Sequence, residues 1–235
     1  MFMTERTALR IVEKPAGIRE RATEMLRSAI LDLTFKPGEP LVERRLCEET
    51  GVSRTSIRES LRILEAEGLV HHIRGKGLCV TEITSDDVRA IYEVRGLLEG
   101  QLLRKIAEAG RPEDAAALHT AVEALSAFSD PEAENAAVGH AIALGKLSEQ
   151  IADSAGNRIA RDILVSLSAR MTYIRAFVSK SATIAERERT LELLRDVAAA
   201  VVAGDADRAE TSYRLYIDRA ATRAVDLSSR AASGR

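Results

Sequence analysis

Arginines recur at four-residue intervals within the stretch 51–64, at Arg54, Arg58 and Arg62. Residues four apart lie on the same face of an α-helix, so this spacing predicts a basic stripe along one side of a helix. A guanidinium group can bond phosphate oxygens and the O6/N7 edge of guanine. Ser53 and Thr55 place hydroxyl groups at the leading end of that helix, where backbone N–H groups also suit a phosphate. The pattern therefore indicates contact with nucleic acid.

The same stripe has a second interpretation, namely a solvated helix whose Arg–Glu pairs only aid solubility. Glu59 and Glu65 are near enough in sequence to partner Arg62. The neighbouring elements favour the first interpretation. Apolar spacing, turn residues and caps predict helices over 17–33, 42–50 and 53–67 and a hairpin with strands at 69–73 and 78–83.

Three helices followed by a hairpin form the winged helix-turn-helix arrangement, in which the third helix enters the major groove. Ser53 is expected to cap this third helix, and Gly51 to end the second. The turn RGKG at 74–77 would carry the cations Arg74 and Lys76 at the tip of the wing. The first 80 residues are thus predicted to be a DNA-binding domain.

The run of residues 26–80 strongly resembles the DNA-binding domain of the GntR family of bacterial transcription regulators. Pro37-Gly38, the GVSRT block at 51–55, Ile57-Arg58-Glu59 and the 67–70 segment EGLV carry the resemblance. It implies that certain residues occupy operator-contacting positions, namely Arg44, Ser53, Arg54, Thr55, Arg58, Arg74 and Gly75. Lys76 is added from its charge and its place in the wing.

After a linker at 81–86, the remaining residues 87–235 are predicted to form an all-α bundle for ligand binding and dimerisation. Ser85 is expected to cap its first helix, and the tail at 228–235 to fray. The fold class is therefore mainly α, with a winged helix-turn-helix domain followed by a helical-bundle effector domain. Amphipathic patterns place helices at 87–109, 113–128, 132–155, 157–180, 184–203 and 206–229.

The second part resembles the FCD effector domain of the FadR-type GntR regulators. The segments 86–108, 147–157 and 203–216 carry this looser resemblance. It implies a cavity for a small carboxylate and, in many such domains, a divalent metal held by one Asp and three His. Here those four positions fall on Leu144, Ser148, Leu194 and Tyr216, so no metal and no other cofactor is expected.

Candidate effector-binding residues follow from charge and position. Arg95 falls on the inward side of its helix, either in an ion pair with Glu99 or free to bind a carboxylate. Arg175 is a second candidate that could instead face solvent. Ser148 and Tyr216 could hydrogen-bond a ligand, and Tyr216 could equally fill space that the metal vacates.

Composition excludes other classes of protein. The 235 residues carry a net charge of −2, and aromatic residues make up 3%. Residues 1–80 hold 14 Lys and Arg against 12 Asp and Glu, or +2, which leaves 20 against 24, or −4, for the remainder. No apolar run is long enough for a membrane span or signal peptide, and Cys47 and Cys79 read as small packing residues, so a cytoplasmic protein is expected.

These features predict a sequence-specific transcriptional repressor controlled by a small carboxylate effector. Helix-turn-helix dimers read two half-sites, so a homodimer on a palindromic operator in double-stranded DNA is expected. An architectural DNA-binding dimer without an effector is the alternative. An enzyme is disfavoured, because the chain has no nucleophile elbow, phosphate-cradling glycine loop or HExxH motif.

Overall fold

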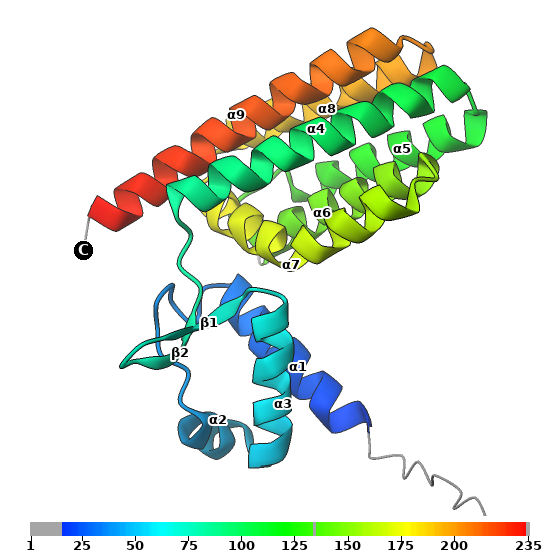
Figure 1. Ribbon diagram of the computed structural model, residues 1–235. Helices are drawn as coiled ribbons and strands as arrows, with labels where there is room; N and C mark the ends of the chain where they lie inside the picture. Colours follow the sequence, from blue (N-terminus) through cyan, green and yellow to red (C-terminus); the bar gives the residue numbers. More distant parts are fainter. Residues whose placement is uncertain (1–15, 134, 234–235) are drawn as a thin grey trace, which may run out of the picture.

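The computed structural model describes residues 16–133 and 135–233. It consists of a small N-terminal unit of three helices and a hairpin, followed by a bundle of longer helices (Figure 1). This is the predicted arrangement, a winged helix-turn-helix ahead of an all-α domain. The bounds 1–80, 81–86 and 87–235 remain a sequence-based prediction.

In the N-terminal unit, local chemistry sets the ends of the helices. Gly51 adopts a left-handed backbone conformation with φ 68° and ends α2, as glycine does at many helix C-termini. Ser53 caps α3 as predicted, because its side chain accepts a hydrogen bond from the Ser56 N–H at 3.2 Å. The elements of this unit are α1 (Ala16–Leu31), α2 (Glu43–Thr50), α3 (Arg54–Ala66), β1 (Val70–Ile73) and β2 (Gly77–Val80).

The two strands form an antiparallel hairpin in which Val70 pairs with Val80. β2 ends at Val80, three residues before the predicted end. The Thr81 N–H still donates to the Leu69 carbonyl at 2.9 Å, in register with the hairpin, and the Thr81 hydroxyl donates to the Gly68 carbonyl at 2.8 Å. Beyond Thr81 the chain leaves the hairpin and reaches α4 at Ser85.

The bundle is built from amphipathic helices that bury one continuous apolar core. α4 and α9 run side by side along their length, and α6 packs on α7 (Figure 1). Left-handed glycines at Gly110, Gly156 and Gly204 separate successive helices. The elements are α4 (Ser85–Ala109), α5 (Pro112–Glu123), the 3₁₀ helix η1 (Ala124–Phe128), α6 (Ala136–Ser154), α7 (Arg158–Ser179), α8 (Ile184–Val202) and α9 (Ala206–Ser233).

Two sequence predictions at the junction of α4 and α9 are wrong. Thr84, not Ser85, caps α4, since the Thr84 hydroxyl accepts from the Asp87 N–H at 3.1 Å. The Ser85 hydroxyl instead lies 3.0 Å from that of Ser228 on α9. The last helix therefore continues through Ser228 to Ser233, and Ser228 lies against the start of α4. Residues 234–235 of the predicted frayed tail lie outside the described residues.

The N-terminal unit and the bundle share packing through α7. Tyr173, only 2% exposed, packs in the apolar core of the N-terminal unit with residues such as Leu26 and Leu69. Beside it, a Cβ added at Gly68 would lie 2.7 Å from Nε of Arg170, so a larger residue there would meet the α7 side chain. α7 is thus part of both units.

None of the helices in the described ranges combines the length and apolar character that a membrane crossing requires. Cys47 and Cys79 are both free thiols; Cys79 is fully buried and Cys47 is half-buried.

The bundle core generates a first prediction. Leu103 on α4 is fully buried, whereas Val202 at the end of α8 is 66% exposed. Leu103→Ala should lower the free energy of unfolding by about 2–5 kcal/mol, because it removes buried methyl groups and leaves a cavity. Val202→Ala, the control, should change it by less than about 0.5 kcal/mol. Urea unfolding followed by circular dichroism measures both, and equal losses would contradict the described core.

Candidate functional site

α3 presents two opposite faces. Ile57, Leu61 and Leu64 are buried in the core of the N-terminal unit, whereas Arg54 and Arg58 are exposed. Arg62 and Thr55 are exposed as well, so the predicted basic stripe lies on the solvent side of the helix, with Ser53 at its leading end. Such a face has the width and chemistry to enter a major groove.

One arginine of the stripe is oriented by a residue that the sequence analysis did not identify. Arg58 donates to both carboxylate oxygens of Glu43 on α2, at 3.0 and 2.8 Å. The hydrogen bond from Arg58 lowers the pKa of Glu43, and the charges of Arg58, Arg54 and Arg62 add to the shift. This pair holds the Arg58 guanidinium in a defined place, whereas Arg54 and Arg62 make no ion pair with described residues.

The hairpin supplies further cations. Arg74, Gly75 and Lys76 are all exposed at its tip, and Gly75 adopts the left-handed φ of 83° that this turn needs. Arg44 on α2 is also exposed and makes a 3.9 Å contact with Glu48. All eight predicted DNA-contacting residues thus lie on the surface of the N-terminal unit. Their contact with DNA remains a prediction.

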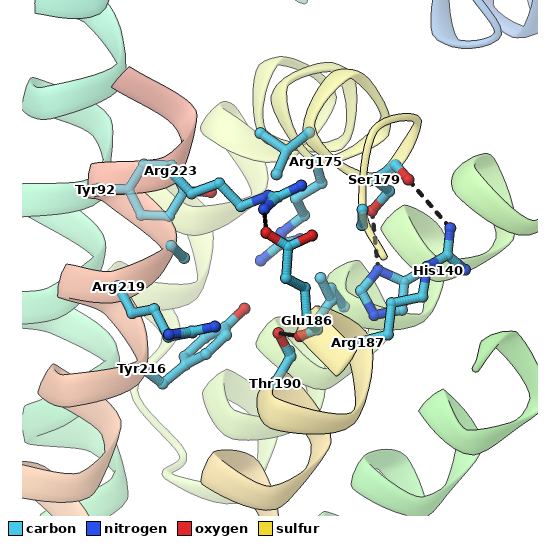
Figure 2. A pocket seen from close by; sticks show the side chains of 14 residues that line it. Tyr92, His140, Arg175, Ser179, Glu186, Arg187, Thr190, Tyr216, Arg219 and Arg223 are labelled. Atoms are coloured by element: carbon cyan, nitrogen blue, oxygen red, sulfur yellow. Dashed lines mark hydrogen bonds and ion pairs between the residues drawn. The ribbon is translucent and has the colours of Figure 1, made fainter. Parts of the chain in front are cut away.

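In the bundle, side chains from α4, α6, α7, α8 and α9 converge on a cavity of about 60 Å³ (Figure 2). This exceeds the roughly 10–15 Å³ that one water molecule requires, but it is far below the ~300 Å³ of typical drug-sized pockets. Only a compact group fits without rearrangement. The lining includes Tyr92, His140, Arg175, Glu186, Tyr216 and Arg223.

Arg95 forms the ion pair with Glu99 that was one of its two predicted roles. Nε of Arg95 lies 3.0 Å from the Glu99 carboxylate, and the two side chains are 2% and 0% exposed. Tyr213 of α9 donates to the same carboxylate at 2.7 Å and accepts from Arg95 at 3.2 Å. The guanidinium carbon also lies 5.3 Å from the centroid of the Tyr92 ring, within range of a cation–π interaction.

Arg175 is buried rather than facing solvent, with an exposure of 5%. It donates to the Ser148 hydroxyl at 2.8 Å, and Arg95 approaches the same oxygen at 3.5 Å. Burial lowers the pKa of Arg175, and the neighbouring Arg95 charge lowers it further. Its guanidinium lies between the cavity of Figure 2 and a smaller cavity of about 30 Å³ on the side of Arg95 and Glu99.

The residues at the FCD metal positions do not suit a cation. Leu144 and Leu194 are buried apolar side chains, Ser148 is bonded to two guanidiniums, and Tyr216 is a buried phenol on the cavity wall. In the described part of the chain, no three His, Cys, Asp or Glu side chains gather where they could hold a metal ion. Two nearby positive charges would also repel one.

The chain matches two family descriptions. "Bacterial regulatory proteins, gntR family" covers residues 18–80, and "FCD domain" covers residues 90–219. The chain belongs to the GntR family. It is therefore a transcription regulator with a DNA-binding GntR domain and an FCD domain, and not an enzyme.

Curated relatives agree with this assignment to the GntR family. The HTH-type transcriptional regulator Rv0494 of Mycobacterium tuberculosis is 30% identical over 234 residues, covering 88% of this chain and 90% of the relative. YdhC of Bacillus subtilis is 33% identical over 48% of this chain and 50% of its own. The Glc operon transcriptional activator of Escherichia coli is 31% identical over 53% and 55%. The chain thus spans about half the length of these last two.

A solved structure shows the same GntR-type fold. A transcriptional regulator GntR from Rhodococcus sp. RHA1 aligns with a TM-score of 0.72 at 23% identity, covering 90% of this chain and 99% of that one. Escherichia coli McbR/YncC aligns with a TM-score of 0.67 at 20% identity, covering 86% and 94%.

The structure adds cavity residues that the sequence analysis missed. Arg219 and Arg223 lie on α9 one and two turns beyond Tyr216, on the same helical face, so the spacing from Tyr216 could have revealed them. Arg187, Glu186 and Ser179 come from the junction of α7 and α8. No local signal marks these three, because their convergence depends on how the two helices cross.

His140 gives a second prediction, on pH. Burial lowers its pKa from 6.5 to about 4, aided by the charges of Arg187 and Arg175, and its ring lies 3.0 Å from the Ser179 hydroxyl. The unfolded chain binds a proton at His140 with a pKa near 6.5, whereas the folded protein binds it only near pH 4. The unfolding free energy is therefore highest above about pH 6.5 and decreases as the pH falls toward 4. From about pH 7.5 to pH 5, the wild type should lose about 2 kcal/mol more unfolding free energy than His140→Gln. If urea unfolding gives the same change in unfolding free energy with pH for the wild type and for His140→Gln, the histidine is not buried in its neutral form.

Proposed function

We propose that this GntR regulator is a repressor that binds a palindromic operator as a homodimer and responds to a small carboxylate effector. The reading surface consists of Arg54, Arg58, Arg44 and the wing. In this proposal the arginines contact base edges and phosphates, while Ser53 and Thr55 at the start of α3 bind a phosphate. A dimer is needed because one copy carries one reading helix, and a palindrome presents two half-sites.

One observation carries the ligand response, namely the double role of α7. Arg175 borders the cavity, and Tyr173, two residues earlier on the same helix, packs in the core of the N-terminal unit. A ligand that moves Arg175 would move α7, the helix that also packs on the N-terminal unit. Such a ligand switches the protein only if it binds the two arrangements of α7 with different affinities.

The effector site is proposed at the cavity of Figure 2, with Arg175 and Tyr216 as binding residues. Ser148, proposed from the sequence as a third, lines the smaller neighbouring cavity and accepts the hydrogen bond from Arg175. Arg95 is assigned a positioning role, because its pairing with Glu99 and its bond toward Ser148 hold the hydroxyl that Arg175 uses. We propose that no metal takes part, and that the protein acts in the cytoplasm, where the chromosome lies.

Two alternatives rest on specific observations. An activator uses the same DNA contacts, and one relative is the Glc operon transcriptional activator. The small cavity volume of about 60 Å³ is also compatible with an architectural DNA-binding dimer that has no effector. The two predictions below separate DNA reading from the ligand response.

The first concerns the reading helix. Arg54→Ala and Arg58→Ala should each weaken binding to the selected operator roughly 10- to 100-fold, because each removes a base or phosphate contact. Arg208→Ala, an exposed arginine on α9, serves as the control and should bind normally. The operator is first recovered by selection from random duplex DNA, and binding is measured by fluorescence anisotropy. Unchanged binding of both α3 variants, with native circular dichroism, would refute this assignment.

The second concerns the effector. A small carboxylate present at ~100 times its Kd should stabilise the protein by about 2.7 kcal/mol in a thermal-shift screen. The same compound should change the affinity of the protein for its operator. If the protein is a repressor, the compound should weaken operator binding. If a broad panel of carboxylates gives neither stabilisation nor a change in operator affinity, the carboxylate response is refuted, and the result favours the architectural alternative.

A further inference from the structure

The cavity beside Arg175 has an unusual charge balance. Of the described residues that line it, four are arginines, namely Arg175, Arg187, Arg219 and Arg223, and one is a carboxylate, Glu186. His140 adds no charge at neutral pH, because burial lowers its pKa to about 4. The lining therefore carries a formal surplus of three positive charges around a space closed by α4, α6, α7, α8 and α9.

Arg175 is buried without a counterion of its own. Its described hydrogen-bond partner is the neutral Ser148 hydroxyl, and its buried Nε has no acceptor. Glu99, the carboxylate whose charge acts on Arg175, is already engaged by Arg95 and Tyr213. A buried guanidinium without a compensating charge is unfavourable, so this position favours the arrival of an anion.

Two more arginines of the lining, Arg187 on α8 and Arg219 on α9, also lack a carboxylate partner. Arg187 is bonded to the backbone oxygens of Phe128 and Ser179, which carry no formal charge, and its buried Nε has no acceptor. Arg219 is exposed at the cavity and makes no hydrogen bond or ion pair with any residue in the described ranges. Figure 2 shows Arg219 and Tyr216 on one side of the open space and Glu186 on the other.

Glu186 neutralises only one of these charges. It forms an ion pair with Arg223, and its other oxygen accepts from the Thr183 N–H at 2.8 Å in the capping box of α8. With Arg223 paired to Glu186, three lining arginines lack a carboxylate ion pair, namely Arg175, Arg187 and Arg219. Arg187 already donates to two backbone oxygens, so Arg175 and Arg219 are the two that have the most capacity left for an anion. A ligand with one negative charge would neutralise only one of them.

We propose that the cavity binds a compact dianion directly through the guanidiniums of Arg175 and Arg219, without a metal ion. The inference rests on the effector site proposed above and specifies what that site selects. The shared chemistry is that of a small dicarboxylate or a phosphate monoester, since both offer paired oxygens that match the planar guanidinium fork. Long acyl chains and whole nucleotides exceed the space.

The test is isothermal titration of the full-length protein in buffer containing EDTA, at about pH 8. Malonate is compared with malonamate, its nearly isosteric monoamide with one charge fewer. Methyl phosphate is compared in the same way with dimethyl phosphate. The dianion of at least one pair should bind roughly 10-fold or more tightly than its monoanion, which corresponds to one lost charge-assisted contact. The pair that responds identifies the ligand class.

Four variants locate the binding. Arg219→Gln should lose roughly 10-fold in affinity for the dianion, because Arg219 pairs with its second negative charge. Affinity for the monoanion should change little, because Arg175 still binds its single charge. Arg175→Met should abolish binding, while its melting temperature without ligand stays unchanged or rises, since an uncompensated buried charge has gone. Glu186→Gln keeps the capping box and should tighten dianion binding. Arg189→Gln, exposed on α8 outside the cavity, is the control and should bind as the wild type does.

Three results would overturn the inference. If each monoanion binds as tightly as its dianion, charge selection is absent although an effector site exists, and the proposed function stands. If binding requires an added divalent metal, the direct role of the arginines is refuted. If no compact anion binds while the wild type still reads its operator, the cavity is not an anion site, and the effector must be sought elsewhere.

Discussion

The bundle depends on how it accommodates guanidinium groups in its interior. The Arg95–Glu99 ion pair is internal to α4, yet it reaches α9 through the Tyr213 hydroxyl and α6 through Ser148. Ser148 in turn accepts from Arg175, which adds α7 to the same network. Although burial lowers the pKa of Arg95, the Glu99 carboxylate and the phenol groups of Tyr213, Tyr216 and Tyr92 together raise it on balance, so the charge persists. Four helices are thereby held in one register by polar contacts inside an apolar core.

The two ends of the molecule use arginine in opposite environments. On α3 the guanidiniums are exposed and are available for a partner whose phosphates outnumber them, so little energy is spent on desolvation before binding. In the bundle Arg95 and Arg175 are buried, so the proposed anion would meet guanidiniums that are already desolvated. The net charge of −2 conceals both groups, because each is a local cluster within a nearly neutral chain.

Local signals predicted the N-terminal unit well. The Ser53 cap, the Gly51 end of α2 and the hairpin turn follow from residue types that act within a few positions of one another. The Arg58–Glu43 pair joins residues fifteen positions apart, and no periodicity reveals it. In the bundle, the sequence did not decide whether Arg175 faces solvent or a ligand. The direction in which that side of its helix points is fixed only by tertiary packing. Ser85 and Thr84 are chemically equivalent caps, and contact with Ser228 on α9 decides between them.

The placement of Tyr173 has a consequence for the order in which the protein folds during synthesis. The core of the N-terminal unit, which includes Leu26 and Leu69, is completed by a side chain from α7. Domains generally fold from the N-terminus as the ribosome releases the chain, at roughly 5–20 residues per second. The N-terminal unit therefore emerges with part of its apolar core exposed, and this surface stays exposed until α7 has been synthesised. The N-terminal unit can complete its packing only after most of the bundle has been synthesised. A chain truncated before α7 would therefore have an incompletely packed N-terminal unit.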